Sequence, residues 1–317
     1  MIAILLRRLG LGAVTLFFVS LLVFGTTQAL PGDAAQAILG KEATPARLAA
    51  LRERLHLDEP VWQQYGKWLA NMARGDLGRS LATEEPVSQL IAGRVGNSGF
   101  LVALSALIAI PLSLALGVIS AARRDQVIDH ALTTGALVLA ALPEFVIGIA
   151  LILVFATNLV HLLPAVTLLA EGVPIWRQID QAILPAVTLD LAVIPYMSRI
   201  MRASMIEVLE SDYVQMARLK GLSPRRVILR HALPNALVPF VQVTALQLAW
   251  LAGGVVVVEF VFRYPGIGAA LVDGVANRDL PVVQALTLMV GGIYVLLNMV
   301  ADMATILLTP RLRTALR

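Results

Sequence analysis

The sequence SDYVQMARLKGLSPRRVILRHALPNALVP occupies Ser211–Pro239, between two long apolar segments. Ser211–Lys220 is expected to form a helix, and Gly221 can adopt the left-handed conformation that ends one. Ser223 is a good N-cap, and Pro224 suits the first position of a second helix. The stretch, here called the elbow, therefore predicts a compact basic helix-turn-helix. Its polar residues suit insertion into a cleft on another protein: Glu210, Asp212, Arg218, Lys220, Arg225 and Arg226.

The composition around the elbow is that of a membrane protein. Of 317 residues, 58% are hydrophobic and 15% charged, against about 45–50% and about 25% in soluble domains. The apolar runs are continuous, which favours a helix bundle over a barrel. The basic residues lie at the ends of these runs, so we expect no nucleic-acid partner. The chain has no cysteine, which excludes disulfides, thiolate metal ligands and a cysteine nucleophile.

Six segments have the length and apolarity to cross a hydrocarbon core of about 30 Å. They are Leu9–Ala29, Phe100–Ala122, Gly135–Ala156, Leu184–Met201, Leu237–Val261 and Val282–Leu308. The first is longer than the roughly 7–15 apolar residues of a signal peptide, so we expect an uncleaved helix. The sequence predicts an all-α integral membrane protein with six transmembrane helices.

Lysine and arginine predict the orientation of these spans. They are abundant beside the N-terminus, after the second span, in the elbow and at the C-terminus, whereas the two short opposite loops carry only Arg177, Arg263 and Arg278. The positive-inside rule then places both termini and the 202–236 loop in the cytoplasm. Three regions are expected: 1–29, the N-terminus and first span; 30–97, an extracytoplasmic helical segment; and 98–317, a five-helix transmembrane core.

The 30–97 segment has the pattern of short amphipathic helices. Thr44 can cap a helix that starts at Pro45. Asp58 and Pro60 open a second helix, which Gly75 and Gly78 terminate, and Pro86–Val95 is a third candidate. The segment therefore predicts three short helices covering one end of the bundle.

The elbow resembles a motif of permease subunits of bacterial binding-protein-dependent ABC importers, E-A-A-x3-G-x9-I-x-L-P. Four positions match, Ala217, Gly221, Leu233 and Pro234, while Gln215, Met216 and His231 differ. The dipeptide, oligopeptide and nickel branch is more similar, with the pattern Y-V-x-x-A-R-x-K-G-L. Its matches are Tyr213, Val214, Ala217, Arg218, Lys220, Gly221 and Leu222. Four further motifs resemble that branch: Leu30–Asp33, Gly75–Gly78, Tyr264–Gly268 and Asn277–Asp279. Because they are spread along the sequence, the resemblance covers essentially the whole chain.

This resemblance implies a type I ABC importer permease fold in a bacterial inner membrane. It implies a homologous second permease, two ATP-binding subunits and an extracytoplasmic solute-binding protein as partners. ATP and magnesium would reside on the ATP-binding subunits, and indeed no G-x4-G-K-[ST] phosphate loop occurs here. The chain would then be a non-catalytic subunit with no cofactor. The substrate class is di- or oligopeptides, with nickel chelates, opines and glutathione as alternatives. The implied ATPase-coupling residues are Glu210, Tyr213, Ala217, Arg218, Lys220, Gly221, Leu222, Leu233 and Pro234.

Polar and soft side chains in the spans are candidates for the translocation path. Gln242 and Gln247 are separated by roughly 140° around a helix, so one of them is expected to face the path. Met197 and Met201, with Met205, form a helical stripe that suits either a packed seam or an adaptable lining. Four acidic residues in or near the spans suit either local pairing or path lining: Glu144, Asp190, Glu259 and Asp302.

The outer loops are candidates for contact with the binding protein. The 30–97 segment and the Tyr264–Pro281 loop are the candidates for this contact, with Arg278 and Asp279 named in the second. The four histidines fall in different segments without a metal-binding spacing, so no metal site is expected in this chain.

Two other functions compete with the importer. Gly96–Gly99 has the G-x-S-G form of an intramembrane serine protease, but Ser98 would need a histidine base within about 3 Å, and the fifth and sixth spans contain no histidine. A secondary transporter working alone usually shows an internal repeat with broken helices at matched positions. We find no convincing duplication in this sequence.

Overall fold

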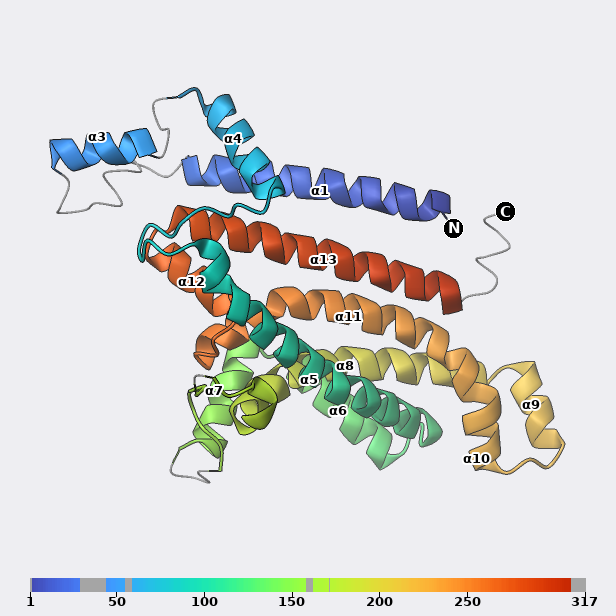
Figure 1. Cartoon of the computed structure of the whole chain (residues 1–317). Helices are drawn as coiled ribbons and strands as arrows, with labels where there is room; N and C mark the ends of the chain where they lie inside the picture. Colours follow the sequence, from blue (N-terminus) through green and yellow to red (C-terminus); the bar gives the residue numbers. More distant parts are fainter. Residues whose placement is uncertain (1, 29–43, 55–58, 158–161, 171, 309–317) are drawn as a thin grey trace. The chain divides into compact units, whose positions relative to one another are not determined.

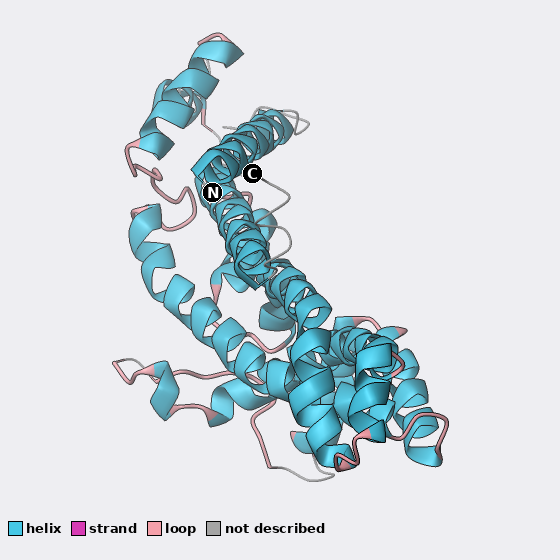
Figure 2. Ribbon diagram, turned by 90° about the vertical axis from the view of Figure 1, so that its right-hand side faces the viewer, coloured by secondary structure: helices cyan, strands magenta, loops and turns pink. Residues whose placement is uncertain are grey.

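The computed structural model describes residues 2–28, 44–54, 59–157, 162–170 and 172–308. The described residues are largely helical, as Figure 2 shows, and they contain no β-strand beyond an isolated bridge between Arg79 and Pro86. The predicted all-helical class is confirmed. Leu30–Asp33 and Asp58 lie outside the described residues.

The chain divides into two compact units, of which unit 1 comprises Met1–Ser98 and Pro265–Ile293. Figure 1 labels its helices: α1 (Ile2–Gln28), α3 (Pro45–Arg54), α4 (Val61–Ala73), the start of α5 (Val87–Ala122), α12 (Ile267–Ala276) and the start of α13 (Leu280–Leu308). Phe24 of α1 packs on the rings of Tyr65 and Trp68 of α4, with centroids 5.4 and 5.5 Å away. A second cluster joins α5, α12 and α13 through Val87, Ile91, Ile267, Val282 and Leu286.

The first two helices predicted in the outer segment are present as α3 and α4, with Pro45 at the start of one and Gly75 after the other. The third is not a separate helix. Val87–Ala122 is one continuous helix of 36 residues, so the predicted third helix and second span are one element. No proline interrupts it before Pro111, and a glycine inside a helix costs only about 1 kcal/mol.

Unit 2 comprises Gly99–Tyr264 and Tyr294–Arg317. Its helix α8 (Asp180–Leu209) packs against α6 (Val127–Ala140), α7 (Glu144–Phe155) and α11 (Leu233–Val261). One buried cluster, which includes Leu101, Leu189, Met201, Leu251 and Phe262, fills the space between them. The 3₁₀ turn η2 (Ile175–Arg177) precedes α8, and α9 (Asp212–Leu219), α10 (Pro224–Arg226) and the π-helical turn η3 (Val227–Ala232) lie between α8 and α11.

Five described helices are long and apolar enough to cross a membrane, and a bent pair makes a sixth. This agrees with the predicted number if the bent pair counts as one span, and the third predicted span, Gly135–Ala156, falls on that pair. The apolar chain breaks between Ala141 and Glu144, and its halves meet at 107°. Pro143 explains the break, because proline lacks an amide donor and disfavours helical geometry in the preceding residue.

Candidate functional site

The first arm of the elbow is helix α9, and the turn after it has the predicted geometry. Gly221 has φ +74°, the left-handed conformation that only glycine adopts without cost. Its amide donates to the carbonyl of Arg218 at 2.9 Å, and the amide of Leu222 donates to that of Ala217 at 3.4 Å. Ser223 is extended and Pro224 begins α10, although the Ser223 hydroxyl makes no capping hydrogen bond.

The second arm is continuous with a membrane-spanning helix, because α10 passes through η3 into α11 without a break. Pro234 gives a physical reason for the wide π turn just before it. In an α-helix its nitrogen would donate to the carbonyl of Arg230, and proline has no hydrogen to donate. The elbow therefore extends directly from the ends of α8 and α11 (Figure 1).

The two arms pack on one another through small apolar side chains. Val214 and Ala217 of α9 are buried together with Val227 and Ala232 of η3. Asn235 also donates from Nδ2 to the Tyr213 hydroxyl at 2.8 Å, which ties α9 to the start of α11. The elbow is therefore a packed unit in which movement of one arm moves the other.

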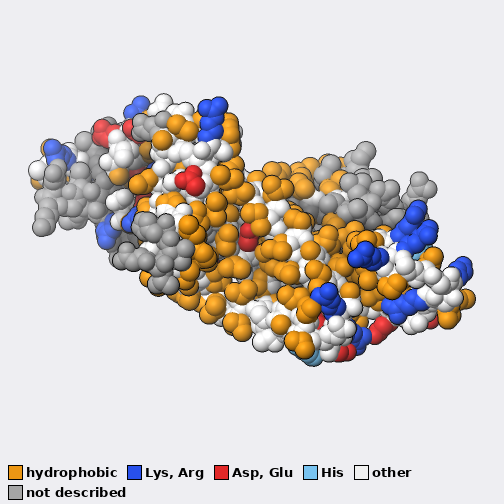
Figure 3. All heavy atoms as spheres, turned by 90° about the horizontal axis from the view of Figure 1, so that it is seen from below, with side chains coloured by type: hydrophobic (Ala, Val, Ile, Leu, Met, Phe, Trp, Pro, Cys, Tyr) orange, Lys and Arg blue, Asp and Glu red, His pale blue; other side chains and the backbone are white. Residues whose placement is uncertain are grey.

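The exposed surface of the elbow combines apolar and basic side chains. Met216 is 58% exposed and Leu219 82% exposed. Figure 3 shows lysine and arginine side chains gathered at one end of the molecule. The exposed basic residues of the elbow are Arg218, Lys220, Arg225, Arg226 and Arg230. The sequence analysis did not include Leu219, although helical spacing from the inward Val214 and Ala217 would have placed it outside.

The structure locates each predicted coupling residue within this region. Ala217 is buried and Leu222 and Leu233 are half-buried, so these three support the packing of the elbow. The others are exposed: Glu210, Tyr213, Arg218, Lys220, Gly221 and Pro234. Glu210 already forms an ion pair with Arg124, in the turn between α5 and α6.

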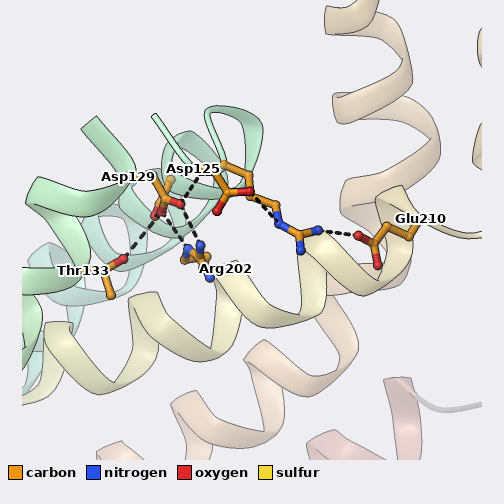
Figure 4. A network of polar contacts seen from close by, with 7 residues as sticks. Asp125, Asp129, Thr133, Arg202 and Glu210 are labelled. Carbon is orange, nitrogen blue, oxygen red and sulfur yellow. Dashed lines mark hydrogen bonds and ion pairs between the residues drawn. The ribbon is translucent and has the colours of Figure 1, made fainter. Parts of the chain in front are cut away.

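A buried ion pair, absent from the sequence analysis, joins α6 to α8 close to the elbow (Figure 4). Arg202 donates from Nε and Nη2 to the two carboxylate oxygens of Asp129, at 2.7 and 2.6 Å. The Asp129 carboxylate also accepts from the Ser120 hydroxyl and from the amide of Asp125. With 2% of its side chain exposed, Asp129 depends on these donors. The network fixes the α5–α6 turn to the part of α8 that precedes the elbow.

The methionine stripe belongs to the core of unit 2. Met197, Met201 and Met205 are at most 2% exposed. A Cβ placed on Gly117 of α5 would lie 2.5 Å from the Cβ of Met201, so the two helices are in close contact there. Met197 and Met201 are therefore packed between helices in this structure, and their place on the translocation path stays a prediction. Gln242 and Gln247 are half-buried on α11 and stay predictions.

Asp279 is buried inside unit 1 and is not on the surface. Its carboxylate accepts hydrogen bonds from the Ser80 hydroxyl and from the amide of Leu81, the latter at 3.0 Å. It holds the 80–86 turn against the start of α13, and its role as a binding-protein contact stays a prediction. The neighbouring Arg278 is exposed, with φ +55°, and stays a prediction.

The serine proposed as a protease nucleophile has a structural contact. Ser98 is 4% exposed, and its Oγ accepts a hydrogen bond from the amide of Ile267 at 2.9 Å. Among the described residues, no group of three histidine, aspartate or glutamate side chains is placed to hold a metal ion.

Comparison with known proteins agrees with the geometry. Residues 113–314 match the family model described as binding-protein-dependent transport system inner membrane component, and residues 1–98 match the model of its N-terminal part. The chain is 38% identical to a probable peptide ABC transporter permease of Sinorhizobium fredii, over 98% of both chains. It is 39% identical to the glutathione transport system permease GsiC of Escherichia coli K12, over 97% of both.

These matches extend over nearly the full length, and they include the elbow and the helices that hold it. A permease has no catalytic centre of its own and works with the other subunits of its transporter. The chain belongs to the family of binding-protein-dependent transport system inner membrane components, and it is a membrane-spanning, non-catalytic permease subunit of an ABC importer.

Proposed function

We propose that the elbow docks onto an ATP-hydrolysing subunit of the importer and passes the movement of that subunit to α8 and α11. One observation carries the proposal: a packed pair of helical arms is continuous with these two helices and exposes apolar side chains at Met216 and Leu219. A packed element transmits displacement, whereas a flexible loop absorbs it. The Asp129–Arg202 pair extends the same movement to α6.

The complete importer contains this chain, a homologous second permease, two ATP-binding subunits that carry ATP and magnesium, and an extracytoplasmic solute-binding protein. The elbow and both termini face the cytoplasm, and the 30–97 segment lies outside. The distribution of basic residues supports this orientation. Transport follows alternating access: ATP binding draws the motor subunits together, the elbows follow, and the spans open toward the binding protein.

The proposed substrate is a di- or oligopeptide. A relative named as a probable peptide permease and one named as a glutathione permease support this class. Glutathione, nickel chelates and opines are the alternatives. Mass spectrometry of the molecule that copurifies with the cognate binding protein distinguishes them, because a peptide is expected and a metal chelate or an opine would contradict the proposal.

Substitution of Leu219 by aspartate tests the docking surface. The side chain is exposed and α9 is buried on its other face, so the fold should persist while a charge enters the apolar part of the contact. We expect the ATP-binding subunits to be lost on copurification and ATP-driven uptake to fall at least ten-fold.

The matched control is Leu168→Asp, at a leucine 77% exposed between α7 and α8. It should leave copurification of the ATP-binding subunits unchanged. Retention of these subunits and of uptake by Leu219→Asp would show that the elbow is not the docking surface.

A further inference from the structure

Unit 2 contains a pocket between α5, α6 and α8. Its volume is about 190 Å³. Its body is apolar, with Leu116 from α5, Ala136 and Leu139 from α6, and Ile194 and Pro195 from α8. This space suits part of one hydrocarbon chain.

Polar residues gather at the end of the pocket nearest the α5–α6 turn. Ser120 follows Leu116 along α5, and Arg199 and Arg202 follow Ile194 along α8. From Ile194 to Arg202 the rise is about 12 Å at 1.5 Å per residue. Because Ser120 and Arg202 both bond to Asp129, these polar ends meet. The pocket is therefore amphipathic along its length.

The charge at the polar end comes from Arg199. Asp129 neutralises Arg202 through two hydrogen bonds, and Arg124 pairs with Asp125 and Glu210. Arg199 is exposed and makes no hydrogen bond or ion pair within the described part of the chain. The pocket therefore presents one uncompensated positive charge beside an apolar hollow.

The surface of α6 beside the pocket is apolar and exposed, at Val127, Leu137 and Val138. In a membrane-spanning subunit such a surface meets hydrocarbon. We propose that the pocket binds an anionic phospholipid, with part of one acyl chain in the hollow and the lipid phosphate at Arg199. A free phosphate would leave the apolar body empty, and an uncharged lipid would leave Arg199 without a counter-ion.

Native mass spectrometry of the purified transporter complex tests this site. Phosphatidylglycerol and phosphatidylcholine with identical acyl chains are added in parallel, so that only the headgroup differs. We expect preferential retention of phosphatidylglycerol. Arg199→Gln should weaken that retention about five-fold, equivalent to about 1 kcal/mol for one arginine near an anionic surface. The matched control Arg177→Gln removes an exposed arginine of η2, outside both the pocket and the elbow, and should leave phosphatidylglycerol retention unchanged.

A second variant tests the hollow without altering charge. A Cβ on Gly135, which lines the pocket, meets nothing within 4 Å, and leucine favours a helix more than glycine does. Gly135→Leu should therefore fold, fill the space and reduce phosphatidylglycerol retention. Thermal unfolding of both variants confirms that the fold is intact.

Three results would overturn the proposal. The first is equal retention of the two lipids by the parent complex, and the second is unchanged retention in Arg199→Gln or Gly135→Leu. The third is lipid binding by the isolated chain that disappears in the complex, because a second permease would then cover the pocket. None of these measurements depends on transport, so their failure is distinguishable from failure of the docking surface.

Discussion

At the scale of single residues, the backbone of Gly221 and the carboxylate of Asp129 hold the coupling region in shape. Gly221 turns the chain between the arms of the elbow with φ +74°. The Asp129 carboxylate accepts hydrogen bonds from α5, from the α5–α6 turn and from α8. The first residue acts through conformational freedom and the second through charge, so their substitutions have different consequences.

Replacement of Gly221 tests the turn. No atom lies within 4 Å of a Cβ placed there, so backbone strain is the whole effect. Gly221→Val should destabilise the elbow by about 1–2 kcal/mol and reduce ATP-driven uptake, whereas Gly221→Asn should be milder, because asparagine tolerates this conformation. Thermal unfolding and uptake assays measure both effects. Gly96→Ala, in a helix with the same open surroundings, is the control and should be neutral or stabilising.

Removal of Arg202 tests the buried pair. Arg202→Ala leaves Asp129 buried without its cation, which should cost about 3–5 kcal/mol. Arg124→Ala breaks the exposed pair with Glu210, with side chains 47% and 62% exposed, and should cost at most about 1 kcal/mol. Thermal unfolding in detergent measures both. If the double variant Asp129→Ala and Arg202→Ala were less stable than Arg202→Ala alone, the pair would not be the cause.

At the scale of elements, helices α8 and α11 link the elbow to the bundle. α8 is the most buried of the candidate spans, and α11 packs along it. The turn η3 lies in the second arm of the elbow and leads into α11 as a π helix, which carries one residue more than an α-helical turn would need. A packed helix pair can move as a unit, and η3 is where its geometry departs from the regular α form.

Single-residue deletions distinguish η3 from the regular helix. Deleting Leu229, which is exposed in η3, should convert the π turn into an α turn and cost no more than the roughly 3 kcal/mol that Pro234 imposes inside an α-helix. Deleting Leu246, similarly exposed in α11, rotates one side of the helix by about 100°. This deletion should displace buried side chains such as Leu251 and Val255. The free energy of unfolding should fall by about 2–5 kcal/mol for each large buried side chain that is displaced. Thermal unfolding compares the two, and equal losses would contradict a one-residue π insertion.

At the scale of the whole molecule, two chain segments that are distant in sequence make unit 1. The outer helices α3 and α4 and the start of α5 share that unit with α12 and the start of α13. The buried contact between Asp279 and Ser80, 199 residues apart, is one of its connections. We expect this unit to present the 80–86 turn to the outside and unit 2 to present the elbow to the cytoplasm.

The absence of cysteine makes this orientation directly measurable. Lys220→Cys introduces a thiol on the exposed elbow, and Ala82→Cys introduces one on the exposed turn of unit 1. An impermeant maleimide should label Ala82→Cys in right-side-out vesicles and Lys220→Cys only in inverted vesicles that lack the ATP-binding subunits, which would otherwise cover the elbow. The parent chain should show no labelling. Labelling of Lys220→Cys from outside would contradict the proposed topology and the docking of the elbow.

The sequence by itself determined the class of fold, the number of spans and the place of the elbow. A helix that faces lipid needs a continuous apolar sequence, so the spans can be predicted without tertiary contacts. Gly221, Ser223 and Pro224 restrict the local backbone, so the elbow can be predicted in the same way. The outward position of Leu219 was also readable, from the spacing of Val214 and Ala217.

Only the tertiary structure decided which polar and methionine side chains are exposed and which are buried. Met201 packs on Gly117 across two helices, Asp279 bonds to Ser80, and Asp129 pairs with Arg202. The partners in each contact are about 70 to 200 residues apart, and no local pattern marks them. The break at Pro143 was a local signal, but its 107° angle depends on how α6 and α7 each pack against α8. Burial and pairing are properties of the folded neighbourhood, because a side chain's surroundings are supplied by segments that only folding brings together.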